Sequence, residues 1–437
     1  MSTLSFSETL TRVGPGTPMG QLMRQYWIPA LMSSELVADG DPVRLMLLGE
    51  KLVAFRDTHG RVGIMDHRCA HRCASLFLGR NEHGGLRCVF HGWKFDVNGN
   101  CIDMPNVPPS KDYKDKVYAR AYRTFEQNGL IWTYMGDRAT PPPIPRVEMT
   151  MVPESEVAID CMQRDCNWLQ VMEGDLDTGH FGFLHLGSLE PEDIADDNFL
   201  HHMTEQRWVE LDVGNKPWGT GYAAHQDVGD KTYWRFANFM FPFWAQNPQS
   251  VFADHVDGGA FVPMDDTHTM VFRFHWLKQT PFIPRTREGG PLPSMGFERD
   301  YLPQTTDWYG RWRPAANASN DWQLDREAQR SGKSFTGIPN LFVQDQAVTE
   351  SAGAILDHSH EHLGPTDEMI ARTRLRLHKA AIDLRDKGTP PPGVDDPHVF
   401  LDARGGSCYT EPGLDWEQVY ADQLDAAVRP GLDLAAE

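Results

Sequence analysis

The sequence predicts an α+β protein in two parts, a small all-β domain followed by a larger α+β domain. Between residues 42 and 134, short apolar runs alternate with glycine-containing turns, which is typical of strands joined by tight connections. After a proline-rich run at 139–147, helical and strand patterns both occur. A length of 437 residues suits two domains or three.

We expect residues 1–39 to form a helical lead-in, because QLMRQYWIPAL carries apolar residues near helical spacing. The β domain then covers residues 40–138, with Asn98-Gly99 as a hairpin turn. Its expected strands are RLMLLGE, KLVAFRD, RVGIMDH, WKFDVNGNCI and LIWTYMG. Residues 139–155 are the expected linker, since ATPPPIPRV interrupts both helix and sheet.

The larger domain is expected at residues 156–437. Its first segment, CNWLQVMEGDLDTGHFGFLH, is helical in its first half, and strands follow at YWRFANFMF, AFVPMD and TMVFRFHWL. Residues 280–335 are rich in Pro, Gly and charge and are expected to form long loops. MIARTRLRLHKAAIDLRDKG is expected to be a helix that a glycine ends.

Composition excludes several classes of function. A net charge of −20 argues against nucleic acid or an anionic membrane as the main partner. No apolar run approaches the roughly 18 residues of a membrane helix. The first residues lack the basic and apolar regions of a secretory signal, so we expect a cytoplasmic protein. In a reducing compartment, clustered cysteines indicate metal before disulfides.

Four ligand-type residues form two loops, Cys69-x-His71 and Cys88-x-x-His91. Two Cys and two His suit either a tetrahedral zinc or a [2Fe–2S] cluster with Cys on one iron and His on the other. Structural zinc sites usually pair like residues within a loop, whereas each loop here is mixed. The nearby Cys73 is expected to be a small buried residue rather than a ligand.

A second cluster follows in the larger domain and contains Glu173, Asp175, Asp177, His180 and His185. Two His and one carboxylate are the ligands of non-haem Fe(II) oxygenases. His180 and His185 are five residues apart, which places them roughly 140° apart on an ideal helix. They converge only if the helix ends or widens, as a π-type turn would allow, and Gly179 and Gly182 lie where that distortion is easiest. The alternative is an acidic helix with two hydrogen-bonded histidines.

The first cluster resembles the Rieske domain of the ring-hydroxylating oxygenases, down to His91-Gly92-Trp93 and Asp96-x-Asn98-Gly99. The family commonly has glycine where Cys73 stands. The second segment is similar to the catalytic signature of the same family, N-W…E-x-x-x-D-x-x-H-x-x-x-x-H. The N-terminal run VGPGTPMGQLMRQYW is similar to the start of the phthalate 4,5-dioxygenase-like branch of that family. The resemblance implies a Rieske [2Fe–2S] domain and a helix-grip-like catalytic domain with an antiparallel sheet.

The resemblance also implies roles for individual residues. Cys69, His71, Cys88 and His91 would hold the cluster. His180 and His185 would bind a mononuclear Fe(II), and Asp177 would link His180 to His91 of a neighbouring subunit in a homotrimer or stacked trimers. Glu173 would line the iron site. NLFVQDQAVTES resembles the family's late acidic motif, which selects Asp345 as the third ligand over Asp357 and Glu350.

No dinucleotide fingerprint is present, because GPGTPMG follows no strand and is interrupted by prolines. Electrons are therefore expected from a separate NAD(P)H-dependent reductase carrying flavin and a ferredoxin-type cluster. O₂ is the expected co-substrate. The sequence is interpreted as the terminal oxygenase that dihydroxylates a phthalate- or benzoate-like acid. Alternatives are an aromatic O-demethylase, a non-catalytic Rieske electron carrier and a zinc-binding interaction protein.

Arg207 and Arg235 are the candidates for binding a substrate carboxylate, since a guanidinium binds carboxylates in bidentate fashion. A structural salt bridge is the alternative for each. The ring-binding wall is expected from Phe239, Phe241, Phe243 and Trp244, with strand core as the alternative. The late run His358, His360 and His362 is interpreted as a polar turn rather than a metal site.

Overall fold

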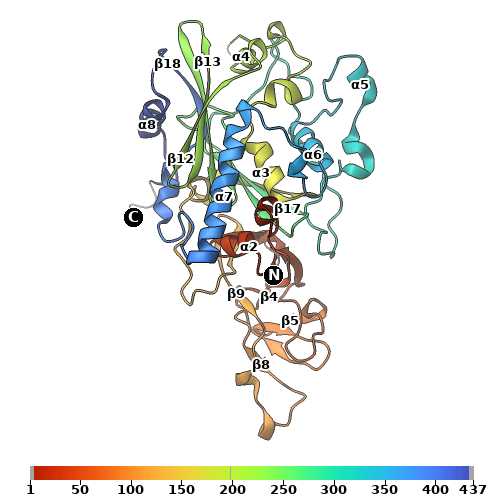
Figure 1. The fold of residues 1–437 in the computed structure, drawn as a ribbon. Helices are drawn as coiled ribbons and strands as arrows, with labels where there is room; N and C mark the ends of the chain where they lie inside the picture. The colour runs from red at the N-terminus through yellow and green to blue at the C-terminus, as the bar shows by residue number, and fades with distance from the viewer. Residues whose placement is uncertain (1–3, 197, 433–437) are drawn as a thin grey trace.

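The computed structural model describes residues 4–196 and 198–432, and it consists of two parts stacked end to end (Figure 1). The smaller part is all-β and forms the lower end of Figure 1. The larger part combines an antiparallel sheet with helices, and the N-terminal helices lie at the junction. The predicted α+β class, with an all-β part first, is confirmed.

Two sheets build the smaller part. A six-stranded antiparallel sheet lies next to the larger part, and a four-stranded sheet lies beyond it. In sheet order the six strands are β1 (Trp27–Met32), β10 (Leu130–Tyr134), β9 (Ala121–Gln127), β4 (Val62–Asp66), β3 (Glu50–Arg56) and β2 (Val43–Leu47). The four strands are β5 (Arg80–Glu82), β6 (Gly85–Arg87), β7 (Lys94–Phe95) and β8 (Cys101–Asp103).

The helical lead-in is shorter than expected. Helices form at α1 (Phe6–Thr11) and α2 (Pro18–Met23), but the expectation of helix is wrong for Trp27–Met32, which is strand β1. Its backbone pairs with β10, with a register shift between Pro29 and Leu31. Proline removes a hydrogen-bond donor that a helix interior needs, whereas an edge strand tolerates it. Residues 139–147 contain neither helix nor strand.

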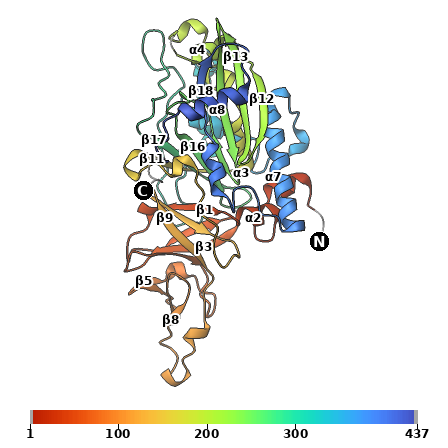
Figure 2. The same cartoon turned by 90° about the vertical axis from the view of Figure 1, so that its left-hand side faces the viewer.

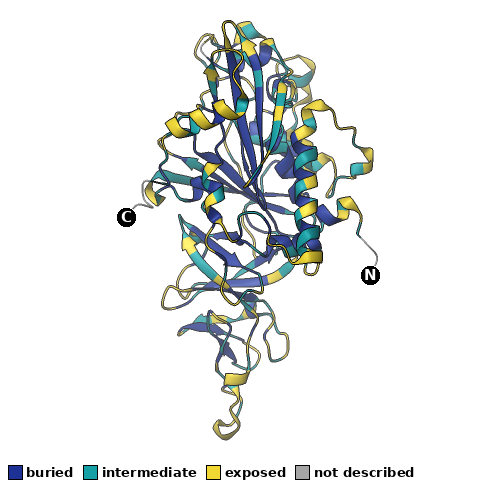
Figure 3. Ribbon diagram, turned by 60° about the vertical axis from the view of Figure 1, so that its left-hand side comes forward, coloured by how far each residue is buried: buried dark blue, intermediate teal, exposed yellow. Residues whose placement is uncertain are grey.

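One eight-stranded antiparallel sheet forms the centre of the larger part. Its central strands are buried, while the helices around it expose their outer faces (Figure 3). In sheet order the strands are β11 (Val157–Arg164), β17 (Thr269–Trp276), β16 (Asp257–Pro263), β15 (Trp244–Gln246), β14 (Lys231–Met240), β13 (Gly219–Val228) and β12 (Glu210–Lys216), and β18 (Gly406–Thr410) also pairs with β14.

Helices pack on this sheet and hold the polar residues described below. α7 lies along β12 and β13, and α3 packs on β15 and β16 (Figure 2). The helices are α3 (Trp168–Leu176), α4 (Leu200–Glu205), α5 (Arg326–Arg330), α6 (Leu341–Ser351), α7 (Glu368–Lys387) and α8 (Trp416–Ala426). Gly388, with φ 67°, ends α7 as expected. Among the described helices, none has the length and apolarity needed to span a bilayer.

The largest hydrophobic core continues across the junction of the two parts. Trp132 of β10 stacks on Trp244 of β15 with ring centroids 5.8 Å apart, and both side chains are buried. The N-terminal segment also fixes the start of α3, because the Asn167 side chain donates to the Thr11 carbonyl and the Trp168 indole to the Leu10 carbonyl. The start of α3, the helix that precedes His180 and His185, is therefore anchored to the N-terminal segment.

A ladder of alternating charges crosses the strands β11, β17 and β16. Arg273 lies between Asp175 and Asp257, and its Nη2 is 3.0 Å from Asp257 Oδ1. His275 contacts Asp257 through Nδ1, and its Nε2 lies 3.6 Å from Asp160. The Asp257 carboxylate raises the pKa of His275 to about 9, against the opposing effect of burial.

We predict that this histidine makes stability fall in mildly alkaline solution. The unfolded chain releases the His275 proton near its ordinary pKa of about 6.5, and the folded chain holds it up to about 9. The folded state therefore binds more protons across this window, and its advantage of up to about 3 kcal/mol is lost as pH rises through it. Urea denaturation from pH 6 to 10 measures this loss.

His275→Gln should flatten the loss over that window, whereas His360→Gln, at an exposed histidine, should leave it in place. An unchanged pH profile in His275→Gln would contradict this assignment.

Candidate metal centres and the pocket between α3 and α6

The first cluster lies on two loops at the outer end of the smaller part. Cys69 and His71 follow β4, and Cys88 and His91 lie between β6 and β7. The peptide N–H of Cys69 donates to Ala74 and that of Cys88 to Trp93, each over 2.8 Å, which fixes both loops. The structure brings all four predicted residues together as two pairs: the imidazoles of His71 and His91 have centroids 4.5 Å apart, and the two thiols are neighbours.

The two pairs suit a binuclear cluster better than one zinc ion. Both cysteines are buried, and burial, together with the adjacent Cys88, raises the pKa of the Cys69 thiol to about 11. The buried Nδ1 of His91 has no hydrogen-bond partner in the described structure, so its lone pair is available. In the described part of the chain, the three-ligand group that fits one metal ion is His180, His185 and Asp345, and it includes none of these four residues. Separate Cys and His pairs are what a Rieske [2Fe–2S] centre requires.

Cys73 differs from the expectation. It is exposed rather than buried, and its φ of 59° lies in the left-handed region. Glycine adopts that conformation at no steric cost, which explains why glycine suits this position. Its peptide N–H donates to the Cys69 carbonyl and closes the ligand loop. The side chain is therefore neither core nor ligand.

The second cluster converges because the chain after α3 forms a π-helical turn. α3 ends at Leu176, and residues Phe181–His185 form the π-helix η7. The extra residue in a π turn compensates for the five-residue spacing of His180 and His185. Their Nε2 atoms lie 3.2 Å apart.

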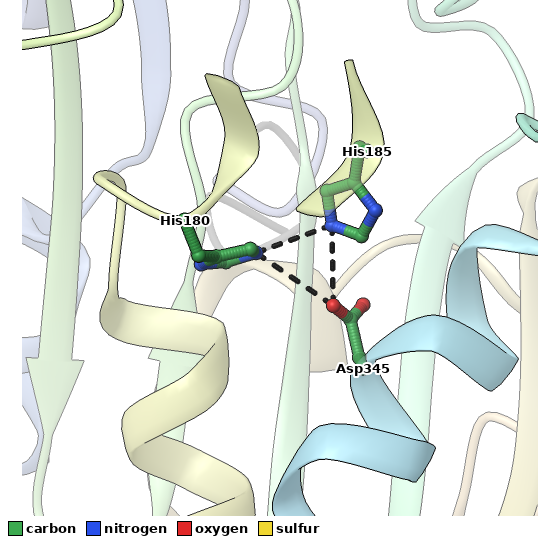
Figure 4. A group of neighbouring side chains, drawn as sticks. All are labelled: His180, His185 and Asp345. Carbon is green, nitrogen blue, oxygen red and sulfur yellow. Dashed lines mark hydrogen bonds and ion pairs between the residues drawn. The ribbon is translucent and has the colours of Figure 1, made fainter. Parts of the chain in front are cut away.

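Asp345 reaches the same point from α6 (Figure 4). Its Oδ1 lies 3.1 Å from His185 Nε2 and 3.6 Å from His180 Nε2. One ligand atom from each of the three residues fits within 4.8 Å of the others. Two imidazoles and one carboxylate on one side of a point are the facial triad of non-haem iron.

The competitors of Asp345 have other partners. Glu350 accepts from the Trp322 indole at 2.7 Å and from the Asp165 peptide at 3.0 Å. Asp357 caps a short exposed turn by accepting from Ser359. The carboxylate that resembles the family's late motif is thus the one that the fold brings to the histidines.

Both histidines present Nε2 to this point because their Nδ1 atoms are occupied. His180 Nδ1 lies 3.0 Å from Asp177 Oδ2, and the Asp177 carboxylate also accepts from the peptides of Gly179 and His180. Burial raises the Asp177 pKa, but the hydrogen bond and charge interaction with His180, together with the two peptide hydrogen bonds, outweigh it and hold the pKa below its usual range. An ionised carboxylate therefore fixes the His180 tautomer.

Gln344 does the same for His185 and was not anticipated. Its Oε1 accepts from His185 Nδ1 at 2.7 Å, and its Nε2 donates to the carbonyls of Ser294 and Ile338 at 2.9 and 2.7 Å. These two carbonyls fix the amide orientation, so Nδ1 carries the proton and Nε2 is free. A glutamine beside a predicted ligand carries no sequence signal of its own.

Two predicted site residues support the cluster from outside the pocket. Glu173 does not line the site: Arg374 binds both of its oxygens at 2.6 Å, and both side chains are buried. Arg207 is likewise absent from the pocket wall. It donates to the carbonyls of Gly182, Leu186 and Leu189 and so closes the end of the π turn.

A pocket opens beside His180, His185 and Asp345. Arg235 lines it as predicted, together with Arg164 and Arg273. Of the two alternatives for Phe239, Phe241, Phe243 and Trp244, the structure supports core, since all four side chains are fully buried. The apolar wall comes instead from Phe181, Phe199, Phe261, Val271, Leu341 and Phe342. The late histidines His358 and His360 lie on a short 3-10 turn and join no metal group among the described residues.

Comparison with known proteins supports the same assignment. The model of the Rieske [2Fe–2S] domain matches residues 26–117, and a model described as LigXa C-terminal domain like matches residues 133–435. The chain is 49% identical to the 3-chlorobenzoate-3,4-dioxygenase oxygenase subunit of Comamonas testosteroni, covering 97% of this chain and 99% of that protein. It is 36% identical to the phthalate 4,5-dioxygenase oxygenase subunit of Pseudomonas putida, covering 84% and 83%.

The crystal structure of dicamba monooxygenase bound to dicamba has the same fold, with a TM-score of 0.54, 17% identity and coverage of 83% and 98%. The chain belongs to the Rieske oxygenases with a LigXa-like C-terminal domain. It is therefore the terminal oxygenase component of a Rieske non-haem iron system, which uses a [2Fe–2S] cluster, a mononuclear iron and O₂ with electrons from a reductase.

We predict that Gln344→Leu weakens the mononuclear iron site alone. Without its acceptor the His185 ring loses its fixed tautomer, and iron affinity should fall about 10–100-fold. Iron titration of the metal-depleted site measures the affinity, and the visible Rieske spectrum should stay unchanged.

Gln346→Leu is the matched control, because Gln346 is a buried amide on the same helix that contacts Arg164 and Ala316 instead of His185. Equal losses of iron affinity in both variants would mean that the amide only supports the helix.

Proposed function

We propose that this oxygenase hydroxylates an aromatic carboxylate of the benzoate or phthalate type, by cis-dihydroxylation of the ring. The observation that carries this is Arg235. Its guanidinium is buried in the wall of the pocket that contains His180, His185 and Asp345, and it forms no ion pair in the described part of the chain. The names of both relatives, a chlorobenzoate and a phthalate dioxygenase subunit, support an aromatic acid.

In this proposal each part of the chain has one task. Residues 40–138 hold the cluster through Cys69, His71, Cys88 and His91, and residues 156–437 hold the iron through His180, His185 and Asp345. When bound, that iron supplies the redox chemistry that activates O₂ beside the ring. The apolar wall positions the ring and excludes water, and Asp177 keeps the proton of His180 on Nδ1.

Electron transfer is proposed to cross between subunits. Asp177 is bonded only to its own turn, and among the described residues no hydrogen bond or ion pair joins it to the cluster loops of the same chain. A neighbouring copy that brings His91 to Asp177 would complete the route, which favours a homotrimer or stacked trimers. The NAD(P)H-dependent reductase would dock through a basic patch, which a chain of charge −20 attracts.

Product analysis tests the reaction. The purified protein, with reductase and NADH, should convert a benzoate or phthalate to a cis-dihydrodiol, found by mass spectrometry with both atoms of ¹⁸O₂ incorporated. Formaldehyde from methoxybenzoates, with no diol from any acid, would assign O-demethylation instead.

His180→Ala should abolish turnover, since it removes a proposed iron ligand, while the visible spectrum of the cluster stays intact. Undiminished oxygenation by this variant would contradict the iron assignment. His268→Ala is the control, because this histidine pairs with Asp265 and lies outside the pocket.

A further inference from the structure

Three arginines line the pocket, and their partners differ. Arg273 is flanked by two carboxylates, Asp175 and Asp257, so its charge is neutralised within the protein. Arg164 forms no ion pair in the described structure, but its two terminal nitrogens donate to Gln346 Oε1 at 3.0 Å and to the Phe342 carbonyl at 3.2 Å. These contacts hold α6, the helix of Asp345, and the positive charge of Arg164 faces that carboxylate.

Arg235 is different, because no carboxylate among the described residues forms an ion pair with it. It is 3% exposed, and Nη1 makes its contact with the thioether of Met203 at 3.5 Å. The neighbouring Tyr222 and Tyr233 are buried and carry no charge that could pair with it. A buried cation without an anion is costly, so this position favours an anionic ligand.

Asn247 supplies a second unused polar group in the same pocket. It is 4% exposed, and neither its Oδ1 nor its Nδ2 has a partner among the described residues. Asn247 follows β15, which pairs with β14, the strand of Arg235, through Asn238 opposite Gln246. Side chains alternate between the two faces of a sheet. Asn238 and Gln246 bond each other on one face. Arg235, three residues before Asn238, and Asn247, one residue after Gln246, therefore face the other side, where the pocket lies.

We propose that Arg235 and Asn247 form a subsite for one carboxylate, and that the pocket takes aromatic monocarboxylates in preference to dicarboxylates. This rests on the proposed function and narrows its substrate class. Arg235 would bind the carboxylate, and the Asn247 amide would donate to it. A second carboxylate would meet the carboxylates of Asp175, Asp177 and Asp345 in the wall. The two guanidiniums on that side are already engaged: Arg273 is paired with two carboxylates, and Arg164 donates to Gln346 and to the Phe342 carbonyl.

The rest of the wall suits a ring with uncharged substituents. The remaining wall is apolar and offers no partner for a second charged group; it includes Phe181, Phe199, Phe261 and Leu341. A halogen, methyl or methoxy substituent would gain from burial there, whereas a second carboxylate would lose its hydration without compensation.

Equilibrium binding to the full-length, metal-loaded protein tests this, with benzoate, phthalate and benzamide as probes measured by isothermal titration calorimetry. Benzoate should bind at least about tenfold more tightly than phthalate, because the second carboxylate of phthalate has no compensating partner. Benzoate should also bind at least about tenfold more tightly than benzamide, because benzamide has no carboxylate for Arg235. Arg235→Met should weaken benzoate binding by about 10–100-fold and leave benzamide nearly unchanged, and Arg235→Lys should restore part of the loss.

Asn247→Leu should weaken benzoate binding by about tenfold. The control is Gln226→Leu, since Gln226 is a buried amide with an unpartnered Oε1 that does not line the pocket. Its benzoate affinity should equal that of the unaltered protein. The cluster spectrum and far-UV circular dichroism report whether each variant is folded. If Arg235→Met does not fold, the benzoate affinity of Asn247→Leu decides the test.

Equal binding of benzoate and phthalate, or unchanged benzoate binding in both Arg235→Met and Asn247→Leu, would overturn the subsite. In that case aromatic acids would still be oxygenated, and the proposed function would stand. If a fully metal-loaded protein neither binds nor oxygenates any aromatic acid, the proposed function fails, and the subsite with it.

Discussion

The site depends on one backbone feature, the π-helical turn at Phe181–His185. A regular helix would point His180 and His185 in different directions, whereas the π turn brings their Nε2 atoms to 3.2 Å. Arg207 closes the end of that turn through three backbone carbonyls, and Asp177 and Gln344 fix the two rings. A local distortion is therefore held by polar contacts from several elements, as is common at functional sites.

Buried charge pairs then decide what the pocket can bind. Glu173 and Arg374 tie α3 to α7, and Arg273 is paired with Asp175 and Asp257. These two arginines are therefore structural, and Arg164 is hydrogen-bonded to α6, so the charge available to a ligand is that of Arg235. Arg235 can recognise a ligand because its charge has no partner within the described protein. An unpaired charge in an apolar wall strongly favours an anionic ligand.

Much of this could be predicted from sequence because metal ligands must be particular residue types at particular spacings. The types and spacing of Cys69, His71, Cys88 and His91 indicate a metal site in this way. The five-residue spacing of His180 and His185 predicts a helix that ends or widens, and the structure contains a π turn there. Asp345 is distant in sequence from the two histidines, so it is predicted as the third ligand only through the family resemblance. Gln344 and Asn247 carried no signal, since an amide becomes informative only when its partners are known. Arg207, Trp27–Met32 and Cys73 differed from expectation because tertiary contacts and backbone conformation decide their places.

The central claim is that His180, His185 and Asp345 share one iron that is distinct from the cluster. Anomalous X-ray diffraction at the iron edge, on crystals of the iron-loaded protein, tests it most directly. We predict an isolated iron peak between His180 Nε2, His185 Nε2 and Asp345 Oδ1, and a separate binuclear peak between the Cys69–Cys88 and His71–His91 pairs. Iron density confined to the cluster, or an isolated iron bound by other residues, would contradict the account.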